Sequence, residues 1–494
     1  MDLNFDIFLL IGSILMFISI IAGKTGYRFG VPMLLLFLII GILFGSGGFG
    51  LQFSSPEVAQ YIGIVALNII LFSGGLDTRV SELKPIYIPG IILATVGVLL
   101  TALITGVFIY WLTNNVIHAV TFSFLESLLL AGIMSSTDSA SVFSILRSKN
   151  LSLKQNLRPL LELESGSNDP MAYMITIVMI QLLQSPEVNG WIVFLKFMQQ
   201  LIFGAAAGYF LGKFAVYLIN KINLDNDALY SVLMLIVMFF MYGITNFIGG
   251  NGFLAVYLGG LVIGNHRVVH KRSSMKFFDG LAWLFQIIMF LTLGLLVEPS
   301  ELLPIAGVAI LIGVFLMLVG RPLAVFMNIF PFKNLTFKAK LFVSWIGLRG
   351  AVPIIFATYP WVSGLPQAKM IFNIVFFITI ISLLFQGTSV SIVARWLGLA
   401  EKTPKAKKMK EFEIELADEI KSATCEIKVN QKMLENGSLL MHMNLPENTL
   451  VVMIKREGRY FVPQGNTQLE VGDSMLMITD NEQALRETQR MLGV

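Results

Sequence analysis

Long apolar runs separated by short polar segments follow one another over the first 397 residues of the chain. Because one membrane-spanning helix needs about 20 apolar residues, these runs predict thirteen spans. The predicted spans are 5–22, 30–46, 57–73, 86–112, 119–146, 159–184, 190–219, 227–249, 252–265, 278–297, 302–329, 339–360 and 368–397. Residues 1–398 are therefore predicted to form an all-α polytopic membrane bundle.

The pattern changes abruptly after the last span. Residues 399–411 read as a charged linker, and strand-like alternation begins soon afterwards in "TCEIKVN", "TLVVMIKR", "YFVPQ" and "DSMLMITD". "REGR" is typical of a hairpin turn, and "NEQALRETQRML" predicts a closing helix. Residues 412–494 are therefore predicted to form a small cytoplasmic α+β domain.

The distribution of charge predicts the orientation of the protein in a lipid bilayer. The loops after odd-numbered spans, counted with the first two residues of the span that follows, carry sixteen Lys and Arg residues, whereas those after even-numbered spans, counted in the same way, carry only Lys369. The positive-inside rule then places the odd loops and the C-terminal domain in the cytoplasm and the N-terminus outside. The run behind "MDLNFD" is predicted to be a retained first helix, since it lacks the basic start of a signal peptide.

Composition supports an integral membrane protein and excludes other classes. The chain is 55% hydrophobic and 13% charged, and its net charge of +4 lies in loops, so no nucleic-acid partner is predicted. A single cysteine, Cys425, excludes an internal disulfide. The four histidines, His118, His266, His270 and His442, lack metal-ligand spacing. No cofactor is predicted.

Two predicted spans contain polar clusters. The fifth carries "STDSAS" with Asp138, and the sixth carries "ELESGSNDP" with Asp169. An ionisable side chain at the bilayer centre costs at least ~2.5–3.5 kcal/mol, so it usually marks a pathway or a site. Ser165 shares a helical face with Asp169, and Glu164 shares one with Asn168. Such oxygen atoms suit a proton or a partly dehydrated alkali cation. Helix-to-helix bonding is the alternative for the serines, Ser135, Ser136 and Ser167.

The twelfth span carries a charge among helix-breaking residues. Arg349 lies in "GLRGAVP", beside Gly347, Gly350 and Pro353, which predicts an interrupted helix whose free backbone lines a polar cavity. A buried guanidinium needs a partner. Glu164 is the predicted partner of Arg349, and Glu162 is the alternative. Two interrupted helices in corresponding positions predict inverted repeats and a transporter site at the midplane.

The remaining charges within or just beyond the spans are predicted to snorkel to the membrane surface or to pair locally. They are Asp77, Arg79, Glu126, Lys196, Lys213 and Arg321. Glu162, one turn nearer the cytoplasm than the polar cluster, is predicted to be an entrance or interface carboxylate.

These motifs resemble those of the monovalent cation/proton antiporters of the NhaP type, which are related to the sodium/proton exchangers. "STDSASV", "ELESGSNDP", "GLRGAVP" and "GNGFLAVYLGGLVIGN" occur in the family's order and spans. The resemblance implies a homodimer in which Asp169 binds cation and proton in turn. Asp138, the Thr137 carbonyl and the Ser165 hydroxyl would complete the ion site, and Glu164 and Arg349 would form a structural ion pair.

The resemblance also bears on charge balance. Asn168 stands where electrogenic relatives carry a second aspartate, which implies electroneutral exchange. In some relatives an acidic residue follows "LF" near the end of the third span, where this chain has Ser73.

The C-terminal region resembles the RCK-C (TrkA-C) module in "LPENTLVVMIKREGRYFVPQGNTQLEVGDSMLMITD". That resemblance implies regulation through residues 412–494, with a small nucleotide-type cytoplasmic effector. The combination with an NhaP-type membrane domain favours exchange of K⁺ for H⁺, and Na⁺/H⁺ exchange is the alternative.

Two other classes are also compatible with polar residues in a membrane. A cation channel would use the same oxygen-lined cavity, but no filter-like repeated loop is present. An intramembrane aspartyl protease would use Asp138 and Asp169, but their surroundings, "STDSAS" and "SNDPM", lack the glycine-aspartate signature of that class.

Overall fold

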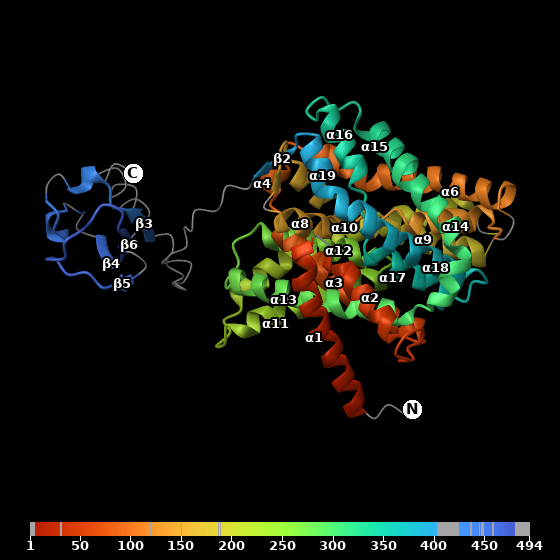
Figure 1. The fold of residues 1–494 in the computed structure, drawn as a ribbon, viewed down its shortest axis with the longest axis horizontal. Coiled ribbons are helices and arrows are strands. Elements are labelled where there is room, and N and C mark those ends of the chain that lie inside the picture. Colours follow the sequence, from red (N-terminus) through yellow and green to blue (C-terminus); the bar gives the residue numbers. More distant parts are fainter. Residues whose placement is uncertain are drawn as a thin grey trace. The chain divides into compact units, whose positions relative to one another are not determined.

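The computed structural model describes residues 5–29, 32–117, 120–149, 151–185, 187, 189–402, 424–434, 437–443, 445, 449–456 and 459–479. The chain forms two compact units, Met1–Thr403 and Pro404–Val494 (Figure 1). The first unit contains the described α-helices, which range from short turns to long spans. They are α1 (Phe5–Phe29), α2 (Met33–Phe44), α3 (Pro56–Asp77), α4 (Val80–Leu83), α5 (Tyr87–Ile92), α6 (Val98–Asn115), α7 (Phe124–Ile133), α8 (Ser139–Ser148), α9 (Leu157–Gln184), α10 (Gly190–Lys221), α11 (Ala228–Phe247), α12 (Gly252–Gly264), α13 (Lys271–Leu296), α14 (Pro299–Phe315), α15 (Arg321–Ile329), α16 (Phe337–Trp345), α17 (Ala351–Val362), α18 (Ala368–Ile381) and α19 (Thr388–Trp396).

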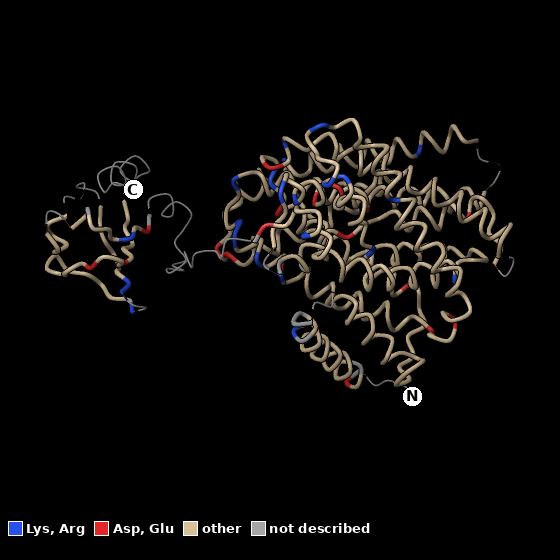
Figure 2. The backbone as a smooth tube through the Cα atoms, turned by 45° about the horizontal axis from the view of Figure 1, so that its top comes forward, with Lys and Arg blue, Asp and Glu red and all other residues tan. Residues whose placement is uncertain are grey.

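Each of the thirteen predicted segments falls on helical residues of this unit. Among the described residues, seven helices are long and apolar enough to cross a membrane by themselves, and several shorter apolar helices accompany them. The unit is therefore an integral membrane bundle, and the number of spans stays a prediction. Figure 2 shows that its lysines and arginines gather mainly at one end.

Departures from α-helical geometry recur along the chain at an interval of seven predicted segments. The fourth segment contains the π-helical turn η1 (Leu93–Gly97), and the eleventh contains η2 (Leu316–Gly320). The fifth is broken between α7 and α8, and the twelfth between α16 and α17. Both predicted helix interruptions are confirmed. The thirteenth contains a further π-helical turn, η3 (Ser382–Gly387). This recurrence supports an internal repeat.

Small residues let the helices around the site approach closely. A Cβ atom on Gly75 of α3 would lie 2.5 Å from the Tyr257 carbonyl oxygen of α12, and one on Gly208 of α10 would lie 2.7 Å from the Ala255 carbonyl oxygen. Contacts between backbones are the usual way in which membrane helices pack, because lipid supplies no hydrophobic drive between them. Helix α12 is thereby held between α3 and α10.

Two short strands of the first unit form an antiparallel pair. They are β1 (Leu151–Leu153), between α8 and α9, and β2 (Ala400–Lys402), directly after α19. Residues 400–402 are part of the predicted linker 399–411, so the start of that linker belongs to the membrane unit.

The second unit is a four-stranded antiparallel sheet in the order β3-β6-β4-β5. Its strands are β3 (Thr424–Lys428), β4 (Thr449–Arg456), β5 (Arg459–Phe461) and β6 (Ser474–Thr479), with the short 3₁₀ turns η4 (Gln431–Leu434) and η5 (Leu440–His442). All four predicted strands and the β4–β5 hairpin are confirmed. Ile454, Met475 and Met477 form the centre of its core. The predicted closing helix lies outside the described residues.

The stability of this sheet is expected to fall in acid through Asp473. Burial by itself would raise the pKa of the Asp473 carboxyl, but hydrogen bonds from Arg456 Nη2 (2.7 Å) and the Glu470 amide (2.9 Å) outweigh it and lower the pKa below 3.8. A lowered folded-state pKa adds stability above the unfolded value of ~3.9, and this stability is lost as the pH falls below it. The protection factors of the β6 amides, which are exchange rates corrected for the intrinsic effect of pH, should therefore fall on acidification below about pH 4. In Asp473→Asn this loss of protection should be weaker. An equal loss in both proteins would contradict the assignment.

Candidate functional site

Two unwound segments cross inside the membrane unit. Residues 134–138 join α7 to α8, and residues 346–350 join α16 to α17. The Asp138 amide donates to the Leu348 carbonyl oxygen at 2.7 Å, so one backbone group of each unwound segment is hydrogen-bonded to the other segment. A Cβ atom on Gly350 would lie 2.5 Å from Asp138 Oδ2, which explains why glycine stands there. Irregular backbone at membrane depth requires such internal satisfaction.

Asp138 directly precedes α8 and is hydrogen-bonded to the first turn of that helix. Its Oδ1 accepts from the Ser141 amide at 3.1 Å, and its Oδ2 accepts from the Ser141 hydroxyl at 2.5 Å. The first contact is an N-cap, which satisfies one of the unpaired amides at the helix start. Asp138 therefore has a structural role whether or not it contacts an ion.

Helix α9 places Asp169, Asn168 and Ser165 against the first unwound segment. Asp169 is 7% exposed, and its Oδ1 accepts from the Ser136 hydroxyl at 2.5 Å. The Asn168 side-chain amide donates to Thr137 Oγ1 at 2.5 Å, and the Ser165 hydroxyl donates to the Thr137 carbonyl oxygen at 2.8 Å. The structure thus brings together Asp169, Asp138, Ser165, Thr137 and Asn168. Asn168 Oδ1 is buried without a hydrogen-bond partner among the described residues.

Arg349 extends from the second unwound segment to the first. Its Nη1 donates to the Ser136 carbonyl oxygen at 2.6 Å, and its amide donates to the Ser382 hydroxyl at 2.9 Å. Ser382 in turn donates to Gln386, whose amide donates to the Trp345 carbonyl oxygen at 2.9 Å. The sequence interpretation did not identify Ser382 and Gln386. Their position as polar residues inside the last predicted span could have identified them.

The predicted pairing of Glu164 with Arg349 is corrected by the structure, which pairs Glu164 with Arg321 at the start of α15. Glu164 and Arg321 are 1% and 2% exposed, so Arg321 does not snorkel to the membrane surface, which was one of its two predicted alternatives; it pairs in the interior. Arg349, 1% exposed, lies within electrostatic range of both. The cluster therefore holds two buried guanidinium groups and one carboxylate. Glu162, the alternative partner, instead pairs with Arg158 at 2.9 Å.

Asn251, in the "GNGF" motif, ties α12 to the proline of α9. Its side-chain amide donates to the Pro170 carbonyl oxygen at 2.9 Å, and its Oδ1 accepts from the Leu254 amide at 3.0 Å. Because Pro170 has no amide proton, helical hydrogen bonding is weakened where Asp169 lies. Helix α9 nevertheless continues through Pro170, and Asn251 supports it from the side.

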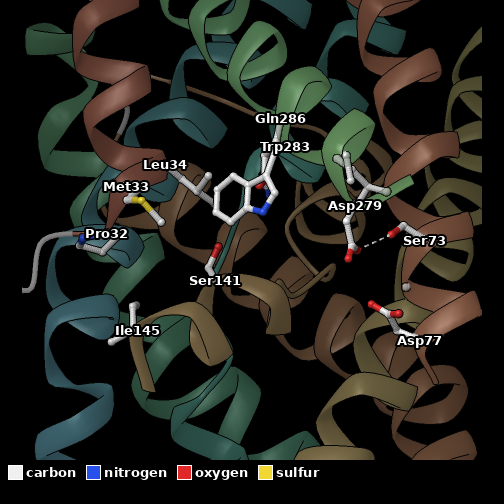
Figure 3. A pocket seen from close by; sticks show the side chains of 13 residues that line it. Pro32, Met33, Leu34, Ser73, Asp77, Ser141, Ile145, Asp279, Trp283 and Gln286 are labelled. Atoms are coloured by element: carbon white, nitrogen blue, oxygen red, sulfur yellow. Dashed lines mark hydrogen bonds between the residues drawn. The ribbon is translucent and has the colours of Figure 1, made fainter. Parts of the chain in front are cut away.

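A cavity of about 190 Å³ adjoins the site (Figure 3). Asp77, Ser73, Asp279 and Ser141 are among its lining residues, so the residue that bonds Asp138 also borders the cavity. The Ser73 hydroxyl donates to Asp279 Oδ1 at 3.4 Å. Asp279 thus supplies a carboxylate beside the position where Ser73 replaces the acidic residue of some relatives. The sequence interpretation missed Asp279, because it lies near the predicted start of a span.

The family described as "Sodium/hydrogen exchanger, transmembrane" matches residues 12–396, the part of the chain that contains both unwound segments and α9. The chain belongs to this family. Residues 437–493 match the TrkA-C domain. The protein is therefore a cation/proton antiporter of the sodium/hydrogen exchanger family, a secondary transporter and not an enzyme, with a TrkA-C domain at its C-terminal end.

Curated relatives cover nearly the whole chain. The "K(+)/H(+) antiporter NhaP" of Alkalimonas amylolytica is 40% identical over 475 residues, which is 95% of this chain and 80% of the relative. The "K(+)/H(+) antiporter NhaP2" of Shewanella sp. (strain MR-4) is 38% identical over 98% of this chain and 83% of the relative.

A solved structure shares the fold of the membrane unit. The sodium proton antiporter MjNhaP1 from Methanocaldococcus jannaschii at pH 8 matches with a TM-score of 0.69 at 22% identity. The match covers 79% of this chain and 99% of that protein.

Proposed function

We propose that the protein exchanges cytoplasmic K⁺ for external H⁺ by alternating access, with one cation and one proton exchanged per cycle. The observation that supports this proposal most directly is the convergence of Asp169, Asp138, Ser165 and the Thr137 carbonyl at the crossing of the two unwound segments. The names of the curated relatives favour K⁺ over Na⁺.

Competition at one carboxylate would couple the two fluxes. A proton or a cation neutralises Asp169, whereas an empty, ionised Asp169 would carry an uncompensated charge across a dry barrier. The bundle therefore changes state only when Asp169 is occupied. Exchange of one monovalent cation for one proton leaves the net charge of the site unchanged, and Asn168, unlike an aspartate, adds no second carboxylate that could take up a further proton.

In this proposal the C-terminal unit lies in the cytoplasm and the N-terminus lies outside the plasma (inner) membrane. The sixteen-to-one distribution of Lys and Arg between odd and even loops supports this orientation. The TrkA-C domain would regulate exchange in response to a small cytoplasmic effector, and the antiporter would act as a homodimer.

Cation-driven proton flux in proteoliposomes tests the proposed function. A K⁺ gradient should drive proton flux at lower cation concentration than a Na⁺ gradient. Clamping the membrane potential with valinomycin should leave an electroneutral rate unchanged. The proposal would be contradicted if neither K⁺ nor Na⁺ drove proton flux, or if the protein gave single-channel currents.

Asp279 is expected to attract the cation into the cavity. It is exposed on α13 and lines the cavity, so its carboxylate is accessible to water and to a hydrated cation. One charge near a cation in water-like surroundings is worth roughly 1 kcal/mol. Asp279→Asn should therefore raise the half-saturating K⁺ concentration about fivefold and leave the maximal rate nearly unchanged. Asp225→Asn, in the exposed α10–α11 loop, is the matched control. An equal effect of both variants would contradict this role.

A further inference from the structure

The loop between α8 and α9 is joined to the segment that leads into the C-terminal unit. Strands β1 and β2 pair in antiparallel register, with Ser152 opposite Glu401. The pairing is extended by a hydrogen bond from the Lys154 amide to the Leu399 carbonyl oxygen at 3.0 Å. Lys154 and Glu401 also approach to 3.5 Å. Both side chains are exposed, so this ion pair contributes little and the backbone pairing carries the contact.

The same loop is joined to both interrupted helices. Strand β1 lies between α8, whose first turn is capped by Asp138, and α9, which carries Asp169. Gln155 Oε1 accepts from the Thr336 hydroxyl at 3.1 Å, and Thr336 caps α16 by accepting from the Ala339 amide. Helix α16 leads directly into the unwound segment that contains Arg349. A displacement of β2 would therefore reach both halves of the crossing.

The backbone of this loop is held in an unfavourable conformation. Gln155 and Asn156 are consecutive residues with φ of 59° and 52°. Left-handed backbone in residues other than glycine costs of order 1–3 kcal/mol and persists only where the surroundings impose it. The contact of Gln155 with Thr336 and the pairing of β1 with β2 supply that constraint. The loop is thus fixed by both of these contacts. A displacement of β2 is therefore passed on to α16 and is not taken up by a change in the loop's conformation.

We propose that the β1–β2 pair is a rigid joint through which the state of the C-terminal unit is transmitted to the two interrupted helices. The joint regulates the same site that carries exchange, so the inference rests on the proposed function. The signal enters at Lys402, the last residue of β2, and reaches Asp138 through α8 and Arg349 through Thr336 and α16.

A four-member cycle in full-length protein tests the joint. Met477→Asp places a charge in the core of the C-terminal sheet, where Met477 is 0% exposed on the central strand β6. Glu401→Pro removes an amide from β2 that a paired strand requires. The initial rate of K⁺-driven proton flux is measured for wild type, both single variants and the double variant. Each single variant should change the rate at least threefold in the same direction, and the double variant should change it no further.

Matched controls separate the joint from general damage. Glu401→Ala removes the exposed side chain but keeps the strand, and Val471→Asp adds a charge at a 60% exposed position of the C-terminal unit. Both should retain the wild-type rate. In a Cys425→Ser background, Ser152→Cys with Glu401→Cys should cross-link on mild oxidation and keep the wild-type rate, because opposed strand residues lie within disulfide reach.

Three results would overturn the inference. They are a double-variant effect equal to the product of the single effects, an unchanged rate in Met477→Asp, and failure of the two cysteines to cross-link. All three leave cation-driven flux of the wild-type protein intact. Loss of that flux itself would instead overturn the proposed function, and the joint with it.

Discussion

Asp169→Asn is expected to abolish K⁺- and Na⁺-driven proton flux in proteoliposomes. Asparagine retains the size of the side chain and can still bond the Ser136 hydroxyl, which contacts Asp169 at 2.5 Å, but it neither ionises nor binds a proton. A permanently neutral site has no competition between cation and proton. Flux should therefore fall to that of protein-free liposomes, while purification yield and oligomeric state stay unchanged.

Asp225→Asn makes the same chemical change in an exposed loop and should exchange at the wild-type rate. Flux near wild type in Asp169→Asn would remove Asp169 from the mechanism. Asp138 would then be the remaining carboxylate at the crossing, although its oxygens already cap α8 and accept from Ser141.

Glu164→Gln is expected to destabilise the membrane unit strongly. It would leave Arg321 and Arg349, which are 2% and 1% exposed, without a buried carboxylate in their cluster. Removing one partner of a buried ion pair costs about 3–5 kcal/mol, because the remaining charge stays buried and uncompensated. The measurement is the temperature at which half of the detergent-solubilised protein remains monodisperse after heating.

A second substitution identifies the partner of Glu164. Glu164→Gln with Arg321→Gln should recover more thermal stability than Glu164→Gln with Arg349→Gln, since Arg321 makes the direct ion pair. Arg349 instead donates to the Ser136 carbonyl oxygen and would leave that group unsatisfied if truncated. Greater recovery with Arg349→Gln would restore the pairing predicted from the sequence.

Local chemistry made much of the site predictable. A carboxylate inside an apolar segment costs free energy in any fold, so Asp138 and Asp169 can be recognised as site candidates from the sequence. Ser165 and Asp169 are one helical turn apart, which places them on one face of a helix. Gly347, Gly350 and Pro353 around Arg349 similarly favour a helix break. The alternation of "TLVVMIKR" and "DSMLMITD" predicts strands for the same reason, since these signals lie within a few neighbouring residues.

Contacts between distant residues were not predictable in this way. Arg321 and Arg349 are both charged residues near glycine, and only tertiary packing, in which α9 and α15 both contact α5 and η1, brings Arg321 to Glu164. Asp279 meets Ser73 across 206 positions of sequence. The three-residue strands β1 and β2 have no alternation long enough to be recognised, and their pairing depends on where α19 ends.

The sequence by itself therefore determined the membrane bundle, the two helix breaks, the residues around Asp169 and the strands of the C-terminal sheet. Each of these follows from the solvation of apolar and charged groups along a short stretch of chain. Tertiary structure alone decided which guanidinium pairs with Glu164, that Asp279 borders the cavity, and that β2 joins the loop between α8 and α9. A buried charge or an open strand edge accepts any suitable partner, and close packing of the helices decides which partner is within reach.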